Sequence, residues 1–435
     1  SFAHILDRSN YKILPYGIGK THELMVYFHE GDREKAQVNA VAEDFQEPAL
    51  IYVSPEWYAH TEVYGELSVP DKSRFTGADR VEENLERIWD FHLFHQKFWN
   101  WYGMWDYGDF QHRFGTGYGW SEKYGQYVPE HGWAYDNGRW AWKNNESVPN
   151  YGLGLMYLRT GKREYYFAAE AMARHIMDVD VHHAGRWKGL GIRHGVQHWA
   201  DGNREERHGN VISYVVPYFL SGDPRTKEVV NELVHEKYFL GIPHYAARHG
   251  AAFNGILMVW EMTGDKKYEE ILANYANAFI DEEGICISPL VIFPEGVGVG
   301  EKTGLNSENM FFHNFGCLAG LVRYHSLTRD KELRQALIRM ADGMDSSSLS
   351  HLGINFFAAR WASGESKEKA KKRMIESLKK EFKTVTAAVP VDPNHWVGEK
   401  AYTSVICDAL CWYTNDMVFA LNIFDEDFAE AIGLC

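Results

Sequence analysis

The chain has 435 residues, of which 45% are hydrophobic and 24% charged, a composition typical of globular proteins rather than of fibrous or disordered chains. No stretch reaches the roughly 18 consecutive apolar residues of a membrane-spanning helix. The net charge of −15, from 45 basic and 60 acidic residues, gives no general attraction for nucleic acid or anionic lipid, so we expect neither nucleic acid nor a membrane as a partner.

Aromatic residues are frequent, because 15 Trp, 25 Tyr and 24 Phe make up 15% of the chain. Aromatic faces cover the apolar faces of sugar rings, although they also fill protein cores. The five cysteines form no Cys-x-x-Cys pair, and their odd number argues against a disulfide framework or a structural zinc site. Residue 1 is serine and no signal-type segment follows it, which indicates a chain processed or cut from something longer.

The first 75 residues predict a small β segment. Residues 22–28, 49–54 and 62–69 are β-favouring runs that are bounded by turn residues or proline. So few strands cannot easily bury a sheet face alone. We therefore expect residues 1–75 to pack on the rest of the chain or to complete a β-sandwich.

From Asp79 onward the apolar residues follow helical spacing, and a helix–turn–helix module then recurs. Each copy has an apolar helix, a tight turn and an amphipathic helix. The turns stand at Gly161, Gly222, Gly264 and residues 328–330. Glycine suits the left-handed position that ends the first helix, and the aspartates at 223, 265 and 330 suit the N-cap of the second.

A helical hairpin cannot bury its own apolar face, so such hairpins must stack. Their long and variable connections favour a closed ring over a uniform solenoid, although an irregular solenoid stays an alternative. The sequence thus predicts a mainly α fold, an α/α toroid of about six hairpins in residues 79–435 as the catalytic domain. In a ring these connections emerge on one rim, where function usually lies.

Polar, aromatic and titratable residues concentrate in these connections. Residues 182–210 hold five His and five Lys or Arg against three Asp or Glu, a local charge opposite to that of the chain. This reversal predicts a site for an anion, most simply a carboxylate. Residues 89–107 hold nine aromatic residues, and the second half of this stretch predicts an aromatic, sugar-binding loop at the same rim.

These residue types favour β-elimination on a uronate polysaccharide. Removing the proton next to a carboxylate needs a His or Tyr base, and cations or donors that stabilise the developing charge. The catalytic candidates are His208 or Tyr214 as the base, Arg193, Arg248 and His249 as the groups that neutralise the carboxylate, and His194 and His198. The substrate-binding candidates are Trp105, Asp106, Tyr107, Trp142, Asn144, Asn145, Trp199, Asn210, Asn254 and His313.

Other chemistries stay open. Glycoside hydrolysis of uronate-containing oligosaccharides needs two facing carboxyl groups, for which Asp106, Asp109, Glu146, Asp201 and Glu308 are eligible. Epimerisation of a free sugar could use His249 and His313. His194 and His198 have the i, i+4 spacing of metal ligands, but Gly195 argues against a helix there. The last alternative is a non-catalytic carbohydrate-binding toroid.

The chain resembles the exo-acting rhamnogalacturonan lyase family. The residues that carry the resemblance are 19–24 (GKTHEL), 55–59 (PEWYA), 101–103 (WYG), 107–109 (YGD), 157–161 (YLRTG) and 174–180 (RHIMDVD). Members have a barrel-like domain, a central β-sandwich and a C-terminal α/α toroid, so residues 1–75 would end the sandwich.

The resemblance implies β-elimination at a uronate adjoining rhamnose, giving unsaturated uronates. It also implies an acidic polysaccharide as partner and a secreted protein, extracellular or periplasmic. Ulvan lyases act on a comparable linkage, so the polymer is of the rhamnogalacturonan or the ulvan type. We expect no cofactor and no metal, with a bound calcium ion as the alternative.

Overall fold

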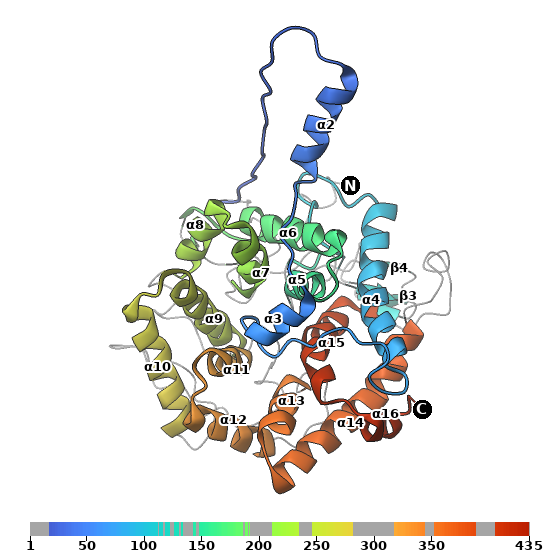
Figure 1. Cartoon of the computed structure of the whole chain (residues 1–435), viewed down its shortest axis with the longest axis vertical. Coiled ribbons are helices and arrows are strands. Elements are labelled where there is room, and N and C mark those ends of the chain that lie inside the picture. Colours follow the sequence, from blue (N-terminus) through green and yellow to red (C-terminus); the bar gives the residue numbers. More distant parts are fainter. Residues whose placement is uncertain are drawn as a thin grey trace.

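The computed structural model consists mostly of helices arranged around a ring (Figure 1). It describes residues 17–111, 113–115, 118–121, 126–129, 132–133, 142–144, 148–185, 188–189, 191, 211–234, 246–281, 317–343, 352–388 and 405–434. Within these residues no helix is both long and apolar enough to cross a membrane.

In the described part of the chain, six inner helices form the ring. They are α5 (Pro149–Thr160), α7 (Ile212–Ser221), α9 (Ala246–Thr263), α11 (Cys317–Thr328), α13 (Leu352–Trp361) and α15 (Cys407–Ala420). Each packs against the next along the chain, and α15 packs against α5. This last contact closes the ring and excludes the irregular solenoid, so the predicted α/α toroid is confirmed.

The outer layer consists of the helices that alternate with the inner ones (Figure 1). They are α4 (Ala78–Phe98), α6 (Arg163–Asp178), α8 (Pro224–Leu233), α10 (Lys266–Asp281), α12 (Lys331–Gly343) and α14 (Gly364–Ala388). The short helices η8 (Leu421–Ile423) and α16 (Glu426–Ile432) follow α15. The core between the two layers contains fully buried rings such as Trp89, Tyr157 and Tyr165.

The hairpin turns follow the predicted chemistry. Gly161 and Gly222 end α5 and α7 with φ of 70° and 68°, the left-handed geometry that glycine adopts without a steric penalty. The Asp223 carboxylate accepts hydrogen bonds from the backbone N–H groups of Arg225 (3.3 Å) and Thr226 (2.9 Å), so it caps α8 as expected.

The predicted strands before residue 75 are wrong for the part that the structure describes. Residues 17–75 instead contain α2 (Lys35–Gln46), α3 (Pro55–Thr61) and a single bridge between Val63 and Gly65. α3 begins where it does because Ser54 accepts a hydrogen bond from the Trp57 N–H and Pro55 occupies the first turn. That residues 1–75 end a β-sandwich stays a prediction.

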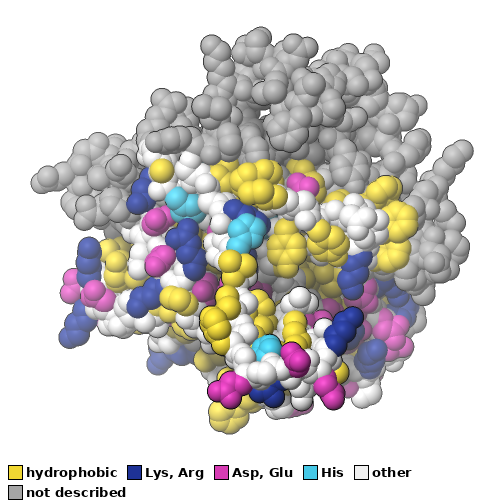
Figure 2. Space-filling view, turned by 90° about the horizontal axis from the view of Figure 1, so that it is seen from above, with side chains coloured by type: hydrophobic (Ala, Val, Ile, Leu, Met, Phe, Trp, Pro, Cys, Tyr) yellow, Lys and Arg dark blue, Asp and Glu magenta, His cyan; other side chains and the backbone are white. Residues whose placement is uncertain are grey.

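Residues 17–49 form an arm that carries α2 and projects from the ring (Figure 1). A strand obtains its hydrogen bonds from a neighbouring strand, and the described residues place none beside residues 22–28. The side chains of Leu24, Val26 and Phe28 are therefore 89%, 70% and 87% exposed. Hydrophobic side chains also gather on the face of the molecule that Figure 2 shows.

The described strands lie in the connections between helices. β1 (Arg113–Gly115) pairs with β4 (Gly132–Trp133) and with β5 (Val405–Ile406), which immediately precedes α15. β2 (Tyr118–Ser121) and β3 (Gln126–Pro129) form an antiparallel hairpin. The β1–β5 pairing joins the connection that follows α4 to the last inner helix, two segments far apart in sequence.

Residues 50–69 cover one end of the ring. α3 and the residues after it lie over the C-terminal ends of the inner helices (Figure 1). Three arginines near those ends hold this segment: Arg159 donates to the Ser68 carbonyl, Arg329 pairs with Glu62 and Arg360 pairs with Glu66. Cations suit helix C-termini because they complement the helix dipole. The N-terminal ends of α5, α11 and α13 therefore lie at the other end of the ring.

His325 makes stability sensitive to acid. Arg334 Nε donates to His325 Nε2 at 3.0 Å, and burial, with Arg334 as a second cause, lowers the pKa of this histidine to about 4. The unfolded chain takes up this proton more readily than the folded chain does. We expect the free energy of unfolding to fall between pH 6.5 and about 4, by up to about 3 kcal/mol.

His325→Gln tests this expectation, because glutamine keeps an acceptor for Arg334 but does not titrate. Urea unfolding at pH 7 and pH 4.5 should show a smaller pH difference for the variant than for the parent chain. Equal pH differences would contradict a neutral, buried His325.

Candidate functional site

Five of the inner helices carry buried polar side chains in their N-terminal half or near their middle. These are Asn150, Ser213, Asn254, Asn355 and Asn415, all at most 2% exposed. Asn150 Nδ2 donates to the Ser213 carbonyl at 2.5 Å, which links α5 to α7. Buried amides need hydrogen-bond partners, so these side chains mark the N-terminal half of the ring as the neighbourhood of the candidate site.

The direction of the inner helices gives this end of the ring a positive character. Among the described helices, α5, α11, α13 and α15 contact the covering segment with residues at or near their C-terminal ends, so their N-terminal ends lie away from it. Each N-terminus carries a partial positive charge from its free backbone N–H groups, which favours an anion. The helix N-termini alone would therefore stabilise a carboxylate at this end of the ring, without any contribution from side chains.

The aromatic loop, residues 99–111, follows α4 and is held by a buried histidine. His175 Nδ1 lies 3.1 Å from the Tyr107 carbonyl oxygen, at hydrogen-bond distance. His175 Nε2 lies 3.6 Å from Asp109 and 3.5 Å from Asp180, and all three side chains are fully buried. This cluster joins the loop to the C-terminal end of α6.

Asp109 also joins two connections. Its carboxylate accepts hydrogen bonds from the backbone N–H groups of Phe110 (2.7 Å) and Asn144 (3.1 Å). Both oxygens are thus engaged by backbone donors in a fully buried position. Asp109 therefore joins the aromatic loop to the connection that carries Asn144, and its eligibility for glycoside hydrolysis stays a prediction. Asn144, a predicted substrate-binding residue, is itself buried in this junction.

Gly108 lets the aromatic loop approach α6. It has a φ of 89°, and a Cβ atom there would lie 2.1 Å from the Ala171 carbonyl oxygen. Gly108→Ala combines left-handed strain with a backbone clash, so we expect it to lower the free energy of unfolding by about 2 kcal/mol or more. Urea unfolding measures the loss.

Gly222→Ala is the matched control for this substitution. Gly222 has a φ of 68°, but a Cβ atom there would meet nothing within 4 Å. The control variant therefore reports the cost of the left-handed backbone alone. If Gly108→Ala destabilised no more than Gly222→Ala, the close packing of the loop on α6 would be refuted.

The predicted aromatic residues of the rim differ in exposure. Tyr107 is 44% exposed, while Trp105 and Asp106 are partly buried in the same loop. Trp142 is only 8% exposed and packs edge-on against Trp101, with 6.0 Å between ring centroids. Its burial favours a packing role, whereas Tyr107 offers ring surface to a ligand.

Three predicted residues occupy neighbouring inner helices. Tyr214 is the third residue of α7 and is fully buried. Arg248 and His249 are the third and fourth residues of α9, which packs against α7. The candidate base and two candidate cationic groups thus come from the first turns of adjacent helices. Asn254 lies buried further along α9.

The remaining predicted site residues lie outside the described residues. They are Arg193, His194, His198, Trp199, His208, Asn210, Asn145 and His313, together with the carboxyl candidates Glu146, Asp201 and Glu308. In the described ranges no group of three or more His, Cys, Asp or Glu side chains is arranged to hold a metal ion. The expectation of no cofactor and the calcium alternative both stay predictions.

The sequence analysis did not predict that the arm contacts α6. Thr21 donates to the Asp178 carboxylate through its backbone N–H (2.6 Å) and its hydroxyl (2.8 Å). Lys20 Nζ lies 5.6 Å from the centre of the Tyr107 ring, and burial lowers the pKa of this lysine. Three of the motifs that carry the family resemblance, 19–24, 107–109 and 174–180, are the segments that meet here. Their joint presence in the sequence was therefore the signal for this contact.

Residues 48–248 match the family model of the PcRGLX-like protein C-terminal alpha/alpha toroid domain. This match supports, at the level of the domain, the resemblance to rhamnogalacturonan lyases. The chain is also similar to the uncharacterized protein YetA of Bacillus subtilis (strain 168), with 34% identity over 227 residues. That alignment spans 52% of this chain and only about a quarter (25%) of the relative's length.

Among solved structures, the chain is similar to the GH76A alpha-1,6-mannanase from Salegentibacter sp. HEL1_6, with a TM-score of 0.47 and 15% identity. An inactive variant of that enzyme in complex with alpha-1,6-mannotriose has a TM-score of 0.44 and 14% identity. Each comparison covers 79% of this chain and 98% of the other.

Proposed function

We propose that this toroid belongs to a polysaccharide lyase that cleaves an acidic, rhamnose- and uronate-containing polysaccharide by β-elimination. The observation that carries the proposal is the match of residues 48–248 to the PcRGLX-like toroid domain. The matched segment includes the aromatic loop, the Asp109–His175–Asp180 cluster and Tyr214. A polymeric substrate of this kind places the enzyme outside the cytoplasm, either extracellular or periplasmic.

The arrangement of the inner helices supports an anionic substrate. Helix N-termini favour a carboxylate at their end of the ring. Arg248 and His249 belong to the first turn of α9, and Tyr214 belongs to the first turn of α7, against which α9 packs. Cationic groups next to a uronate carboxylate lower the cost of the negative charge that develops when the neighbouring carbon loses its proton.

In the proposed reaction Tyr214 or His208 removes the proton from C5 of the uronate. Arg193, Arg248 and His249 stabilise the charge that spreads onto the carboxylate. The electron pair of the broken C5–H bond forms the C4=C5 double bond, while the C4–O bond to the next sugar breaks. The departing oxygen takes up a proton, so the products are an unsaturated uronate and a new chain end.

The test is an assay on rhamnogalacturonan and, separately, on ulvan. Near-ultraviolet absorbance and reducing ends are followed together, with heat-inactivated protein as the control. New reducing ends with rising absorbance are expected, because the C4=C5 double bond is conjugated with the carboxylate. New reducing ends without a rise in absorbance would indicate hydrolysis instead of elimination. The candidate catalytic carboxyl groups would then be those of Asp106, Glu146 and Glu308. No change on either polymer would overturn the proposal.

A further inference from the structure

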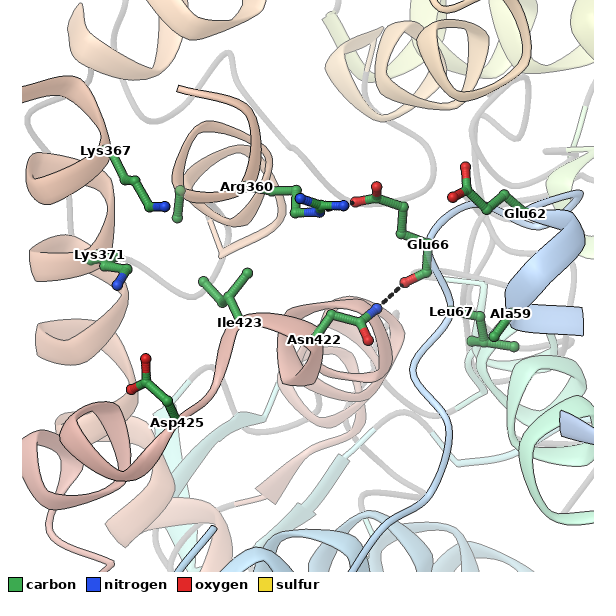
Figure 3. A pocket seen from close by; sticks show the side chains of 11 residues that line it. Ala59, Glu62, Glu66, Leu67, Arg360, Lys367, Lys371, Asn422, Ile423 and Asp425 are labelled. Carbon is green, nitrogen blue, oxygen red and sulfur yellow. Dashed lines mark hydrogen bonds and ion pairs between the residues drawn. The ribbon is translucent and has the colours of Figure 1, made fainter. Parts of the chain in front are cut away.

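A polar pocket of about 430 Å³ opens on the covered end of the ring (Figure 3). Its walls come from α3 and the segment after it, the last turn of α13, the first turns of α14, η8 and the residue that caps α16. This pocket lies at the C-terminal end of α13, whereas Tyr214 lies in the first turn of α7. Its volume is within the range of small-molecule sites.

The acidic groups of the pocket are already engaged. Glu66 Oε2 lies 3.3 Å from Arg360 Nε, and Glu62 pairs with Arg329. The Asp425 carboxylate accepts a hydrogen bond from the Phe428 N–H (2.9 Å) and so caps α16. Each carboxylate in the wall therefore has a structural partner.

Two lysines of the pocket are not engaged in this way. Lys367 and Lys371 lie one turn apart on α14 and both line the pocket. The Lys367 side chain points across it toward Arg360, and the Lys371 ammonium is turned to the side where Asp425 lies (Figure 3). Both are partly buried, and neither forms a hydrogen bond or ion pair with another described residue. Like charges at this spacing repel each other, so an anion bound between them would relieve that repulsion.

The rest of the lining suits a sugar more than a bare ion. Ala59, Leu67 and Ile423 supply apolar surface that the C–H face of a ring can cover. Asn422 Nδ2 donates to the Glu66 carbonyl at 2.6 Å, which leaves its Oδ1 to accept a hydroxyl group. The pocket thus combines a cationic wall, an apolar surface and a hydroxyl acceptor.

We propose that this pocket binds a small sugar acid, a uronate monosaccharide or disaccharide, with its carboxylate between Lys367 and Lys371. The site is separate from the end of the ring where the substrate is proposed to bind. Its occupation joins α14 to the η8–α16 connection and so stabilises the folded ring. The proposal concerns binding only and does not depend on lyase activity.

Isothermal titration calorimetry with galacturonate and glucuronate tests the proposal. Galactose and inorganic phosphate serve as the neutral sugar and the simple anion. We expect saturable binding of a uronate, at least tenfold weaker binding of galactose and of phosphate, and a raised melting temperature with the uronate. Equal binding of phosphate would show a general anion site and overturn the sugar-acid assignment, as would the absence of uronate binding.

The double variant Lys367→Gln/Lys371→Gln locates the binding. It should reduce uronate affinity at least tenfold and leave the rate of polysaccharide cleavage unchanged. Lys372→Gln, an exposed lysine on the same helix, should bind uronate like the parent chain. Unchanged affinity in the double variant would place the bound uronate elsewhere and refute the proposal, whatever the outcome of the lyase assay.

Discussion

Arg159→Met is expected to lower the free energy of unfolding by about 3–5 kcal/mol, the cost of leaving a buried charge without its partner. Arg159 Nη2 donates to both Glu82 oxygens, at 2.7 and 3.0 Å, and Nε donates to the Ser68 carbonyl at 2.9 Å. The two charged side chains are 0% and 8% exposed. Methionine fills a similar volume but leaves the Glu82 carboxylate buried without a cation. Urea unfolding at pH 7 measures the change.

Two further variants separate the buried pair from general charge effects. Lys162→Gln breaks the more exposed pair with Glu86 (3.0 Å) and should cost less than about 1 kcal/mol. Arg159→Met/Glu82→Leu removes both charges and should recover most of the stability that Arg159→Met loses. A loss below 1 kcal/mol for Arg159→Met, or no recovery in the double variant, would contradict a role for this pair in joining α5 to α4.

Tyr214→Phe is expected to reduce kcat for polysaccharide cleavage by about 10²–10⁴-fold, the usual contribution of a positioned base. Tyr214 is fully buried in the first turn of α7, and phenylalanine keeps its shape while removing the hydroxyl. The effect should fall on kcat rather than on KM, because the hydroxyl acts on the proton and not on substrate affinity. The near-ultraviolet assay measures both constants.

Tyr218→Phe provides the matched control, because Tyr218 lies one turn further along α7 and is partly exposed. It should leave kcat within about twofold of the parent value. Melting temperatures show whether either variant is simply less stable. If a folded Tyr214→Phe protein kept its full rate, the assignment of Tyr214 as base would be wrong, and His208 would remain as the predicted base.

The helical ring was predictable because its signals are local. Gly161 and Gly222 end inner helices in left-handed geometry, and Asp223 caps the helix that follows. Each requirement acts within one turn of the backbone, so residue type alone reveals it. The need for hairpins to stack then follows from their apolar faces.

The strands were mispredicted because β-structure depends on partners that local sequence does not supply. Residues 22–28 have strand-forming composition but lie exposed on the arm, with no strand beside them in the described part of the chain. β1, by contrast, pairs with β5, nearly 300 residues later in the sequence (Phe114 with Val405). A pairing of this range is decided by how the ring closes, and not by propensity.

In the candidate site, too, some features follow from the local sequence and others only from the tertiary structure. The sequence by itself determined the helices, their caps and the concentration of polar and aromatic residues in the long connections, because spacing and turn chemistry carry that information. Only the tertiary structure decided that residues 50–69 cover one end of the ring, that Asp109 and His175 hold the aromatic loop, and that Tyr214 lies in the first turn of a helix beside the one that carries Arg248. These contacts join segments far apart in the chain, and closure of the ring is what brings them together.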